Sequence, residues 1–200
     1  MARRSDHTRE ELRDMILEAA RNIVETQGYQ ALTVRAVTSR VGYTAGTLYQ
    51  IFDNLEALLA AVNAETVAEL GDSIVAQTRD IKDPKARLRK MSHRYVDFAF
   101  AHPDRWRLAF EQIAPDGGDR PEIITRETGA VFDCVNRLLA QAAPRLSPNR
   151  LKNGAAAFWS SVHGVCHLAL SRRLDLATDQ PVYVVLDELI DTYFAGIEKP

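Results

Sequence analysis

Side chains that can hydrogen-bond a nucleic acid are concentrated between Thr33 and Gln50. Arg35 falls in one short helical stretch. Small or hydroxyl-bearing residues surround the start of the next stretch, namely Thr44, Ala45, Thr47 and Tyr49. Guanidinium and hydroxyl groups donate to phosphate oxygens and base edges, and a helix start adds its backbone N–H groups. This set of residues predicts contact with DNA.

The first element expected to position these groups is a helix from Arg9 to Thr26. Its apolar residues recur at spacings of three and four, which places them on one stripe of the helix. Gly28 is the residue expected to end it. The stripe consists of Leu12, Ile16, Ala19, Ala20 and Ile23.

A second helix is expected from Thr33 to Arg40, and a third, capped by Thr44, to about Phe52. Gly42 lies between them and can take the left-handed backbone conformation that strains residues with a Cβ. In a helix-turn-helix, one helix crosses the DNA backbone while the next enters the major groove. We therefore expect a helix-turn-helix head, packed through Val34, Val37, Val41 and Leu48.

Two segments of this head, Ala31–Val37 and Val41–Phe52, resemble the tetracycline-repressor (TetR/AcrR) family, and Glu56–Leu59 is similar to the start of that family's fourth helix. The resemblance implies an all-helical homodimer whose N-terminal heads read a palindromic operator and whose C-terminal body binds a small molecule. It also implies a DNA-binding set. Phosphate contacts would be made by Thr33, Thr47 and Tyr49, and contacts near base edges by Arg35, Thr44 and Ala45. Tyr43 and Gln50 complete the set.

The chain departs from the family pattern at two positions, Leu55 and Ala45. The family often has lysine where this chain has Leu55, so a point charge at the start of the fourth helix is missing. Ala45 stands where a longer polar residue is common, so contacts to thymine methyl groups or DNA shape are expected to compensate for sparse hydrogen bonding.

The sequence divides into two expected domains. Residues 1–59 form the helix-turn-helix domain, with 1–8 as a flexible basic arm, and residues 60–200 form a helical domain for ligand binding and dimerisation. Arg3, Arg4 and Arg9 can neutralise phosphates or enter a minor groove. The alternative is that the arm is a solvated tail.

Overall composition favours a globular protein with a local, rather than global, attraction to DNA. The chain has 25 basic and 27 acidic residues, so no strong positive field surrounds it. Its 200 residues are 46% hydrophobic, enough for a real core. It has two cysteines, no secretion signal after Met1 and no apolar run near the ~20 residues of a membrane span, which together predict a cytoplasmic protein.

The rest of the chain also reads as helical, with no strand pattern anywhere. A long fourth helix begins after Asp53 and Asn54, which are both good caps, and serves as a connector. The fold class expected is all-α, with a three-helix head joined by this helix to a C-terminal bundle. The later helices are expected around Leu88–Phe98, Trp106–Phe110, Glu122–Ala143, Arg150 to about Leu174, and Val182–Ile197.

Aromatic residues in the bundle exceed what a small core needs, and a helical bundle can hold a cavity among them. The segments Ala101–Pro103, Phe158–Trp159 and His163–Gly164 resemble a Trp-His-Gly type of the family's body. For each aromatic residue the alternative is ordinary core packing. The candidate ligand-binding residues are Tyr95, Phe98, Trp106, Phe110, Phe132, Phe158, Trp159 and His163.

A metal-binding or enzymatic alternative rests on His163 and His167, which lie four apart on one helical face, and on Cys166, which is adjacent to His167. No third ligand at a usable spacing, no Gly-rich phosphate loop and no placed nucleophile accompany them. A non-DNA-binding helical adaptor is another alternative. We expect no enzyme activity, no metal and no cofactor.

The last two helices are apolar on more than one side, which predicts that they pair with a second copy across a two-fold axis. The alternative is burial within one chain. Two heads ~34–36 Å apart can read major grooves one turn apart. The expected function is that of a repressor released by a small apolar or aromatic effector, with activation as the alternative.

Overall fold

The computed structural model describes residues 7–111 and 122–197, and in these ranges it contains nine α-helices, two short 3₁₀ helices and no strand. The all-α class is therefore confirmed. The basic arm at residues 1–6, with Arg3 and Arg4, lies outside the described residues. The helices are α1 (Arg9–Gln27), η1 (Tyr29–Ala31), α2 (Val34–Val41), α3 (Ala45–Tyr49), α4 (Leu55–Thr78), α5 (Pro84–Ala101), α6 (Pro103–Phe110), α7 (Glu122–Ala142), α8 (Pro148–Leu170), η2 (Leu174–Leu176) and α9 (Val182–Ile197).

The chain forms two compact units. The first extends to Val67 and also includes the segment from His102 to Thr125, and the second holds Ala68–Ala101 and the chain from Arg126 onward. The helix α6 thus belongs to the first unit together with α1, α2 and α3. The functional division at residues 59 and 60 remains a prediction. None of the helices in the described ranges is long and apolar enough to cross a membrane.

The core of the first unit is built on α1, whose apolar stripe is buried as predicted. Ile16, Ala20 and Val24 have no exposed surface, and Val37 of α2 and Leu48 of α3 pack into the same cluster. A capping box begins α1, because the Thr8 hydroxyl accepts from the Glu11 N–H and the Glu11 carboxylate accepts from the Thr8 N–H at 2.7 Å. The hydrogen bond from the backbone N–H of Thr8 has the largest effect on the pKa of Glu11, which it lowers. The side chain of Thr8 lowers this pKa further.

The helix α6 joins the first unit through both apolar and polar contacts. Leu108 is buried in the same core as α1, and His102 Nδ1 lies 2.5 Å from a carboxylate oxygen of Glu25 near the end of α1. The buried Arg105 donates from Nε to the hydroxyl of Thr66 on α4 at 3.3 Å. Three independent contacts therefore hold α6 against α1 and the first half of α4.

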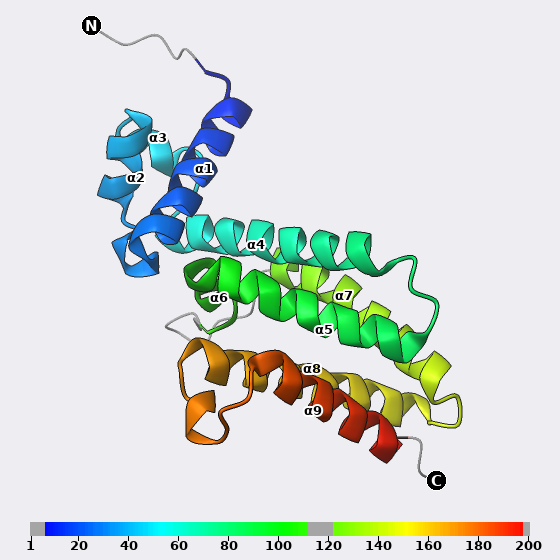
Figure 1. Ribbon diagram of the computed structural model, residues 1–200. Helices are drawn as coiled ribbons and strands as arrows, with labels where there is room; N and C mark the ends of the chain where they lie inside the picture. Colours follow the sequence, from blue (N-terminus) through cyan, green and yellow to red (C-terminus); the bar gives the residue numbers. More distant parts are fainter. Residues whose placement is uncertain (1–6, 112–121, 198–200) are drawn as a thin grey trace, which may run out of the picture. The chain divides into compact units, whose positions relative to one another are not determined.

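In the second unit α5 packs against both α8 and α9, and α8 and α9 run antiparallel beside each other (Figure 1). Buried residues from all three helices form the core, and Leu88, Leu186, Ile190 and Cys166 have no exposed surface. A polar seam borders this core, with residues on α5 and α9 repeating every four positions. The seam consists of Lys85, Arg89, His93 and Asp97 on α5 and of Asp191, Asp187 and Tyr183 on α9.

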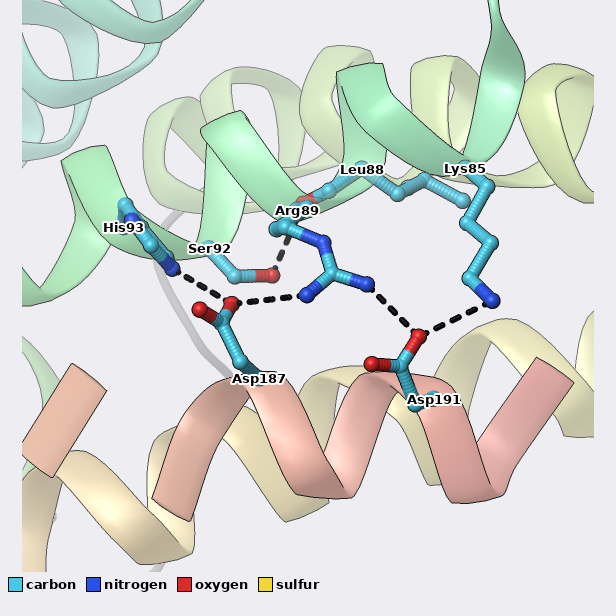
Figure 2. Close-up of polar contacts among 7 residues, drawn as sticks. All are labelled: Lys85, Leu88, Arg89, Ser92, His93, Asp187 and Asp191. Atoms are coloured by element: carbon cyan, nitrogen blue, oxygen red, sulfur yellow. Dashed lines mark hydrogen bonds and ion pairs between the residues drawn. The ribbon is translucent and has the colours of Figure 1, made fainter. Parts of the chain in front are cut away.

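Figure 2 shows the ion pairs that the polar seam forms between α5 and α9. Asp191 accepts from Lys85 at 2.9 Å and from Arg89 at 2.6 Å, and Asp187 meets both Arg89 (3.1 Å) and His93 (2.8 Å). The hydrogen bonds from Lys85 and Arg89 lower the pKa of Asp191. Because Arg89 reaches both carboxylates, the two helices have one favoured register.

The other end of the polar seam is a hydrogen bond rather than an ion pair between helices. The Tyr183 hydroxyl donates to Asp97 at 2.5 Å, and Arg94 pairs with the same carboxylate at 2.8 Å. The bond to Asp97, helped by burial, raises the pKa of Tyr183 to about 12. This phenol therefore stays protonated and continues to donate throughout the neutral range.

The helix α8 ends at Leu170, four residues before the predicted end. Arg172 takes a left-handed conformation (φ 55°), its N–H donates to the Ala169 carbonyl, and the N–H of Arg173 donates to the Leu168 carbonyl. These two bonds are those of a Schellman motif, which terminates a helix. The prediction of a longer helix was wrong because glycine, the usual residue at this position, is absent.

The substitution Asp191→Asn tests the polar seam. We expect a lower melting temperature than wild type at pH 7 and a shrinking difference toward pH 3. A carboxyl whose folded pKa is lowered contributes stability above its unfolded pKa of about 3.9, and that contribution disappears as pH falls through the folded pKa. Thermal unfolding followed by circular dichroism at both pH values measures the effect.

Asp80→Asn is the matched control for this substitution. Asp80 is also an aspartate of the second unit, but its side chain is 94% exposed and lies 3.9 Å from Arg79. Such a surface pair contributes little, so the control should unfold like the wild type. A deficit for Asp191→Asn that is the same at pH 3 and pH 7 would contradict the assigned ion pairs.

Candidate functional site

The predicted tight turn between α2 and α3 is present at Gly42. Its backbone is left-handed (φ 76°, ψ 20°), and its N–H donates to the Thr38 carbonyl to end α2. Open space surrounds the position where a Cβ would stand, so backbone conformation rather than crowding favours glycine there. The turn leads directly from one short helix into the next (Figure 1).

Hydroxyl groups cap both helices that flank the turn. Thr33 accepts from the Ala36 N–H at 3.1 Å to cap α2, and Thr44 accepts from the Thr47 N–H at 3.3 Å to cap α3. The hydroxyl oxygens of Thr44 and Thr47 also lie 3.0 Å apart. Since that bond uses one of their two protons, the Thr44–Thr47 pair can donate one further hydrogen bond outward.

The eight predicted DNA-binding residues all belong to the first unit. Tyr43 and Thr47 are half-buried, and the Tyr49 side chain is 49% exposed, a high value for a large aromatic residue. Leu48, between Thr47 and Tyr49, is buried instead and ties α3 to the core. The residues that the structure exposes are Thr33, Arg35, Thr44, Ala45, Tyr49 and Gln50.

The start of α4 is capped by a side chain and packed against the core, although it has leucine at position 55 where the family often has lysine. Asn54 accepts from the Ala57 N–H at 2.7 Å and is therefore the cap, whereas the sequence left Asp53 and Asn54 as alternatives. Leu55 is half-buried and packs against the core of the first unit. Leu55 thus stabilises the head by packing.

The sequence analysis missed one residue near this surface, His7. Its Nδ1 lies 2.7 Å from the hydroxyl oxygen of Tyr43, and the two rings meet edge to face with centroids 6.0 Å apart. His7 and Tyr43 are 36 residues apart in the chain. No local pattern could have revealed this pairing, because the packing of α1 against α2 creates it.

In the second unit four of the predicted ligand-binding residues form an aromatic chain across α5, α8 and α7. The Tyr95 hydroxyl lies 2.8 Å from His163 Nδ1, and the rings of His163 and Trp159 are 5.0 Å apart. Trp159 in turn meets Phe132 edge to face at 5.5 Å. This aromatic chain combines apolar surface with a polar pair at one end.

The other four predicted ligand-binding residues lie elsewhere. Phe158 is buried and packs edge to face against Tyr193 of α9 at 5.2 Å. Trp106 and Phe110 pair with each other on α6 in the first unit, at 5.7 Å. Phe98 is buried on α5. Two of the eight predicted residues therefore belong to the first unit and six to the second.

The proposed metal-ligand set of His163, Cys166 and His167 has other surroundings. His163 is within hydrogen-bond distance of Tyr95, and Cys166 is fully buried. In the residues that the structure describes, no three His, Cys, Asp or Glu side chains are grouped as a metal ion would require. The metal alternative gains no support from this geometry.

The outer surfaces of α8 and α9 are less apolar than the sequence suggested. On α9 the stripe Leu186, Ile190 and Phe194 faces the core of the same chain. Val184 (50% exposed) and Leu168 on α8 (40% exposed) are exposed hydrophobic residues of this pair. Tyr183 of α9 is exposed as well (36%), and the other exposed positions are small or polar, including Ala156, Ala157, Ser160, Glu188, Thr192 and Ala195.

Two family models match the chain. "Bacterial regulatory proteins, tetR family" matches residues 16–62, and "Tetracyclin repressor-like, C-terminal domain" matches residues 88–193. The first match covers the helix-turn-helix and the start of α4. The second covers more than half of the chain and includes the aromatic chain and all of the polar seam except Lys85.

Relatives and solved structures agree with these matches. The uncharacterized HTH-type transcriptional regulator Rv0681 of Mycobacterium tuberculosis is 27% identical over 94% of this chain and 82% of its own length. The HTH-type transcriptional activator FasR of Mycolicibacterium smegmatis is 29% identical over 64% of this chain and 61% of its own. A protein of unknown function from Rhodococcus sp. RHA1 shares the fold, with a TM-score of 0.77, 24% identity and coverage of 99% of this chain and 100% of its own.

The substitution Thr44→Ala tests the capping of α3. Loss of an N-cap hydroxyl costs about 1 kcal/mol, and here it also removes the partner of Thr47. We expect faster hydrogen exchange at the amides of Thr47 and Leu48, whereas Thr44→Ser, which keeps the oxygen, should exchange like the wild type. Equal protection in the Ala variant would show that the cap does not hold α3.

Proposed function

Because the chain belongs to the TetR family of bacterial regulatory proteins, we propose that this transcriptional regulator is a repressor that binds a palindromic operator as a homodimer. The observation that carries the proposal is the exposed, capped α3 helix after the left-handed turn at Gly42. Its neighbours are hydroxyl, amide and guanidinium groups, which suit a phosphate backbone and base edges.

Most of the exposed groups of the predicted set have an assigned role in this interface. The Tyr49 hydroxyl and the outward proton of the Thr44–Thr47 pair donate to phosphate oxygens. The Thr33 hydroxyl also donates to a phosphate, since its oxygen accepts the hydrogen bond that caps α2 and its proton is available. Arg35 reaches toward base edges, where a guanidinium can form two hydrogen bonds. Ala45 offers a methyl group to thymine. The charge of the interface is low, so a single head binds weakly and affinity comes from two heads.

The second copy docks on α8 and α9 in this proposal. Val184 and Leu168 supply exposed apolar surface, and the small residues Ala156, Ala157 and Ser160 allow two helices to approach closely. A two-fold axis then sets two heads at a spacing that matches successive major grooves. The palindrome of the operator follows from that symmetry.

The effector in this proposal is a small aromatic compound that binds at the aromatic chain of the second unit. Trp159 and Phe132 offer ring faces and edges, and the Tyr95–His163 pair offers a hydrogen-bonding group. To release DNA, the effector must bind the released conformation more tightly than the operator-bound one. The helix α4, which starts in the head and continues into the second unit, is the covalent path for that coupling.

Selection of duplexes from a random DNA library with the purified protein tests the DNA-binding proposal. We expect an inverted repeat with half-sites about one helical turn apart and an affinity that falls steeply with salt. A reporter with the selected duplex across its promoter should be expressed less when the protein is present. Increased expression would establish activation, the role for which the relative FasR is named.

The substitution Arg35→Ala tests the base-edge assignment. We expect a loss of about 1–3 kcal/mol in binding to the selected duplex and relaxed sequence preference at one position of each half-site. Arg79→Ala, at an exposed arginine of the second unit, is the matched control and should bind like the wild type. Unchanged affinity for Arg35→Ala removes this residue from the interface.

Tryptophan fluorescence tests the effector proposal with a panel of phenols and benzoate as probes. The chain has two tryptophans, Trp106 and Trp159, so a difference between wild type and Trp159→Phe reports on the second. We expect a probe that releases the selected duplex to quench emission in the wild type and not in Trp159→Phe. Equal quenching in both proteins would place the effector away from the aromatic chain.

A further inference from the structure

The guanidinium of Arg13 is held beside the segment that follows α3. Arg13 lies in the second turn of α1 and is exposed, and its Cζ stands over the ring of Phe52 at 5.7 Å from the ring centroid. Phe52 comes three residues after Tyr49, the last residue of α3, and is buried in the core of the first unit. A ring fixed by the core therefore places a charged group that solvent can reach.

This cation–π contact leaves the hydrogen-bonding capacity of Arg13 unused. The ring attracts the charge of the guanidinium and accepts none of the hydrogen bonds that its five N–H groups can donate along the edge of the planar group. Among the residues that the structure describes, no carboxylate lies within ion-pair distance of Arg13. The side chain is thus positioned by the protein and able to bind an anion from outside it.

We propose that Arg13 binds a phosphate of the operator beside the end of α3, and that Phe52 is its positioning residue. This inference rests on the DNA interface proposed above. There the phosphate donors Thr33 and the Thr44–Thr47 pair lie at the starts of α2 and α3. The major groove is bordered by the phosphates of two strands, so a helix that enters it meets a backbone on each side. Arg13 adds a charged donor from α1.

The side chains around Phe52 show why a charge from another helix matters here. The segment from Gln50 to Glu56 contains no basic residue, and its two carboxylates, Asp53 and Glu56, are both exposed. Exposed carboxylates repel a phosphate backbone within a Debye length of about 8–10 Å. The guanidinium that Phe52 places in front of this segment offsets that repulsion, and its planar fork can donate two hydrogen bonds to one phosphate.

A salt titration of binding to the selected duplex, with full-length protein, tests the phosphate contact. Each such contact contributes about 0.9 to the slope of log affinity against log salt, so Arg13→Gln should reduce the slope by about two units for a dimer on two half-sites. Affinity at low salt should fall on the order of tenfold per head, with sequence preference unchanged. Arg13→Lys, which keeps the charge, should retain most of the slope.

Arg21→Gln is the matched control, because it removes the same charge from α1 about 12 Å further along the helix. It should bind with the slope of the wild type, and thermal unfolding checks that each variant is folded. An Arg13→Gln protein that binds like Arg21→Gln overturns the inference and leaves the proposed function intact. Absence of DNA binding by the wild type would overturn the proposed function itself and this inference with it.

A double-mutant cycle tests the role of Phe52. Phe52→Leu keeps an apolar side chain in the core but removes the ring, so Arg13 should lose its fixed place and the duplex should be bound less tightly. In the Arg13→Gln background the same substitution should cost little further affinity. An equal loss in both backgrounds, measured where all four proteins are folded, would show that Phe52 does not act through Arg13.

Discussion

The short helix α3 depends on contacts from outside itself. A helix of five residues makes too few backbone hydrogen bonds to persist in water, where even helices of about 12–15 residues are marginal. Leu48, buried in the core that α1 builds, and the Thr44 cap compensate for this. Arg13 of α1 adds a cation–π contact with the ring of Phe52 just after α3. The position of the exposed groups that we propose to contact DNA therefore depends on this core.

The two units stabilise their helices by different means. In the first, an apolar cluster joins α1, α2, α3 and α6, and polar contacts such as His102–Glu25 lie at its border. In the second, the polar seam repeats along α5 and α9 and selects one register. Apolar packing alone allows α5 and α9 to slide past each other by one helical turn. Such a shift would break the ion pairs that Arg89 makes with both Asp187 and Asp191. The aromatic chain lies on helices whose positions this seam helps to set.

Much of the fold could be predicted from local patterns. The apolar stripe of α1, the caps at Thr33 and Thr44 and the glycine turn depend on neighbours within four residues, and all appear in the structure. The predictions fell short where several conformations are locally acceptable. Asp53 and Asn54 are equally good caps, and only packing of Leu55 into the core selects Asn54. The end of α8 at a left-handed arginine carries no glycine to mark it.

By itself the sequence determined the helical class, the helix-turn-helix and the types of side chain available to DNA, because periodicity and capping act over single turns of helix. Tertiary structure alone decided which distant residues meet. It paired His7 with Tyr43, joined Tyr95 to His163, and brought Trp106 together with Phe110 in the first unit. Such contacts link residues tens of positions apart, and their formation depends on how whole helices pack, which no local spacing encodes.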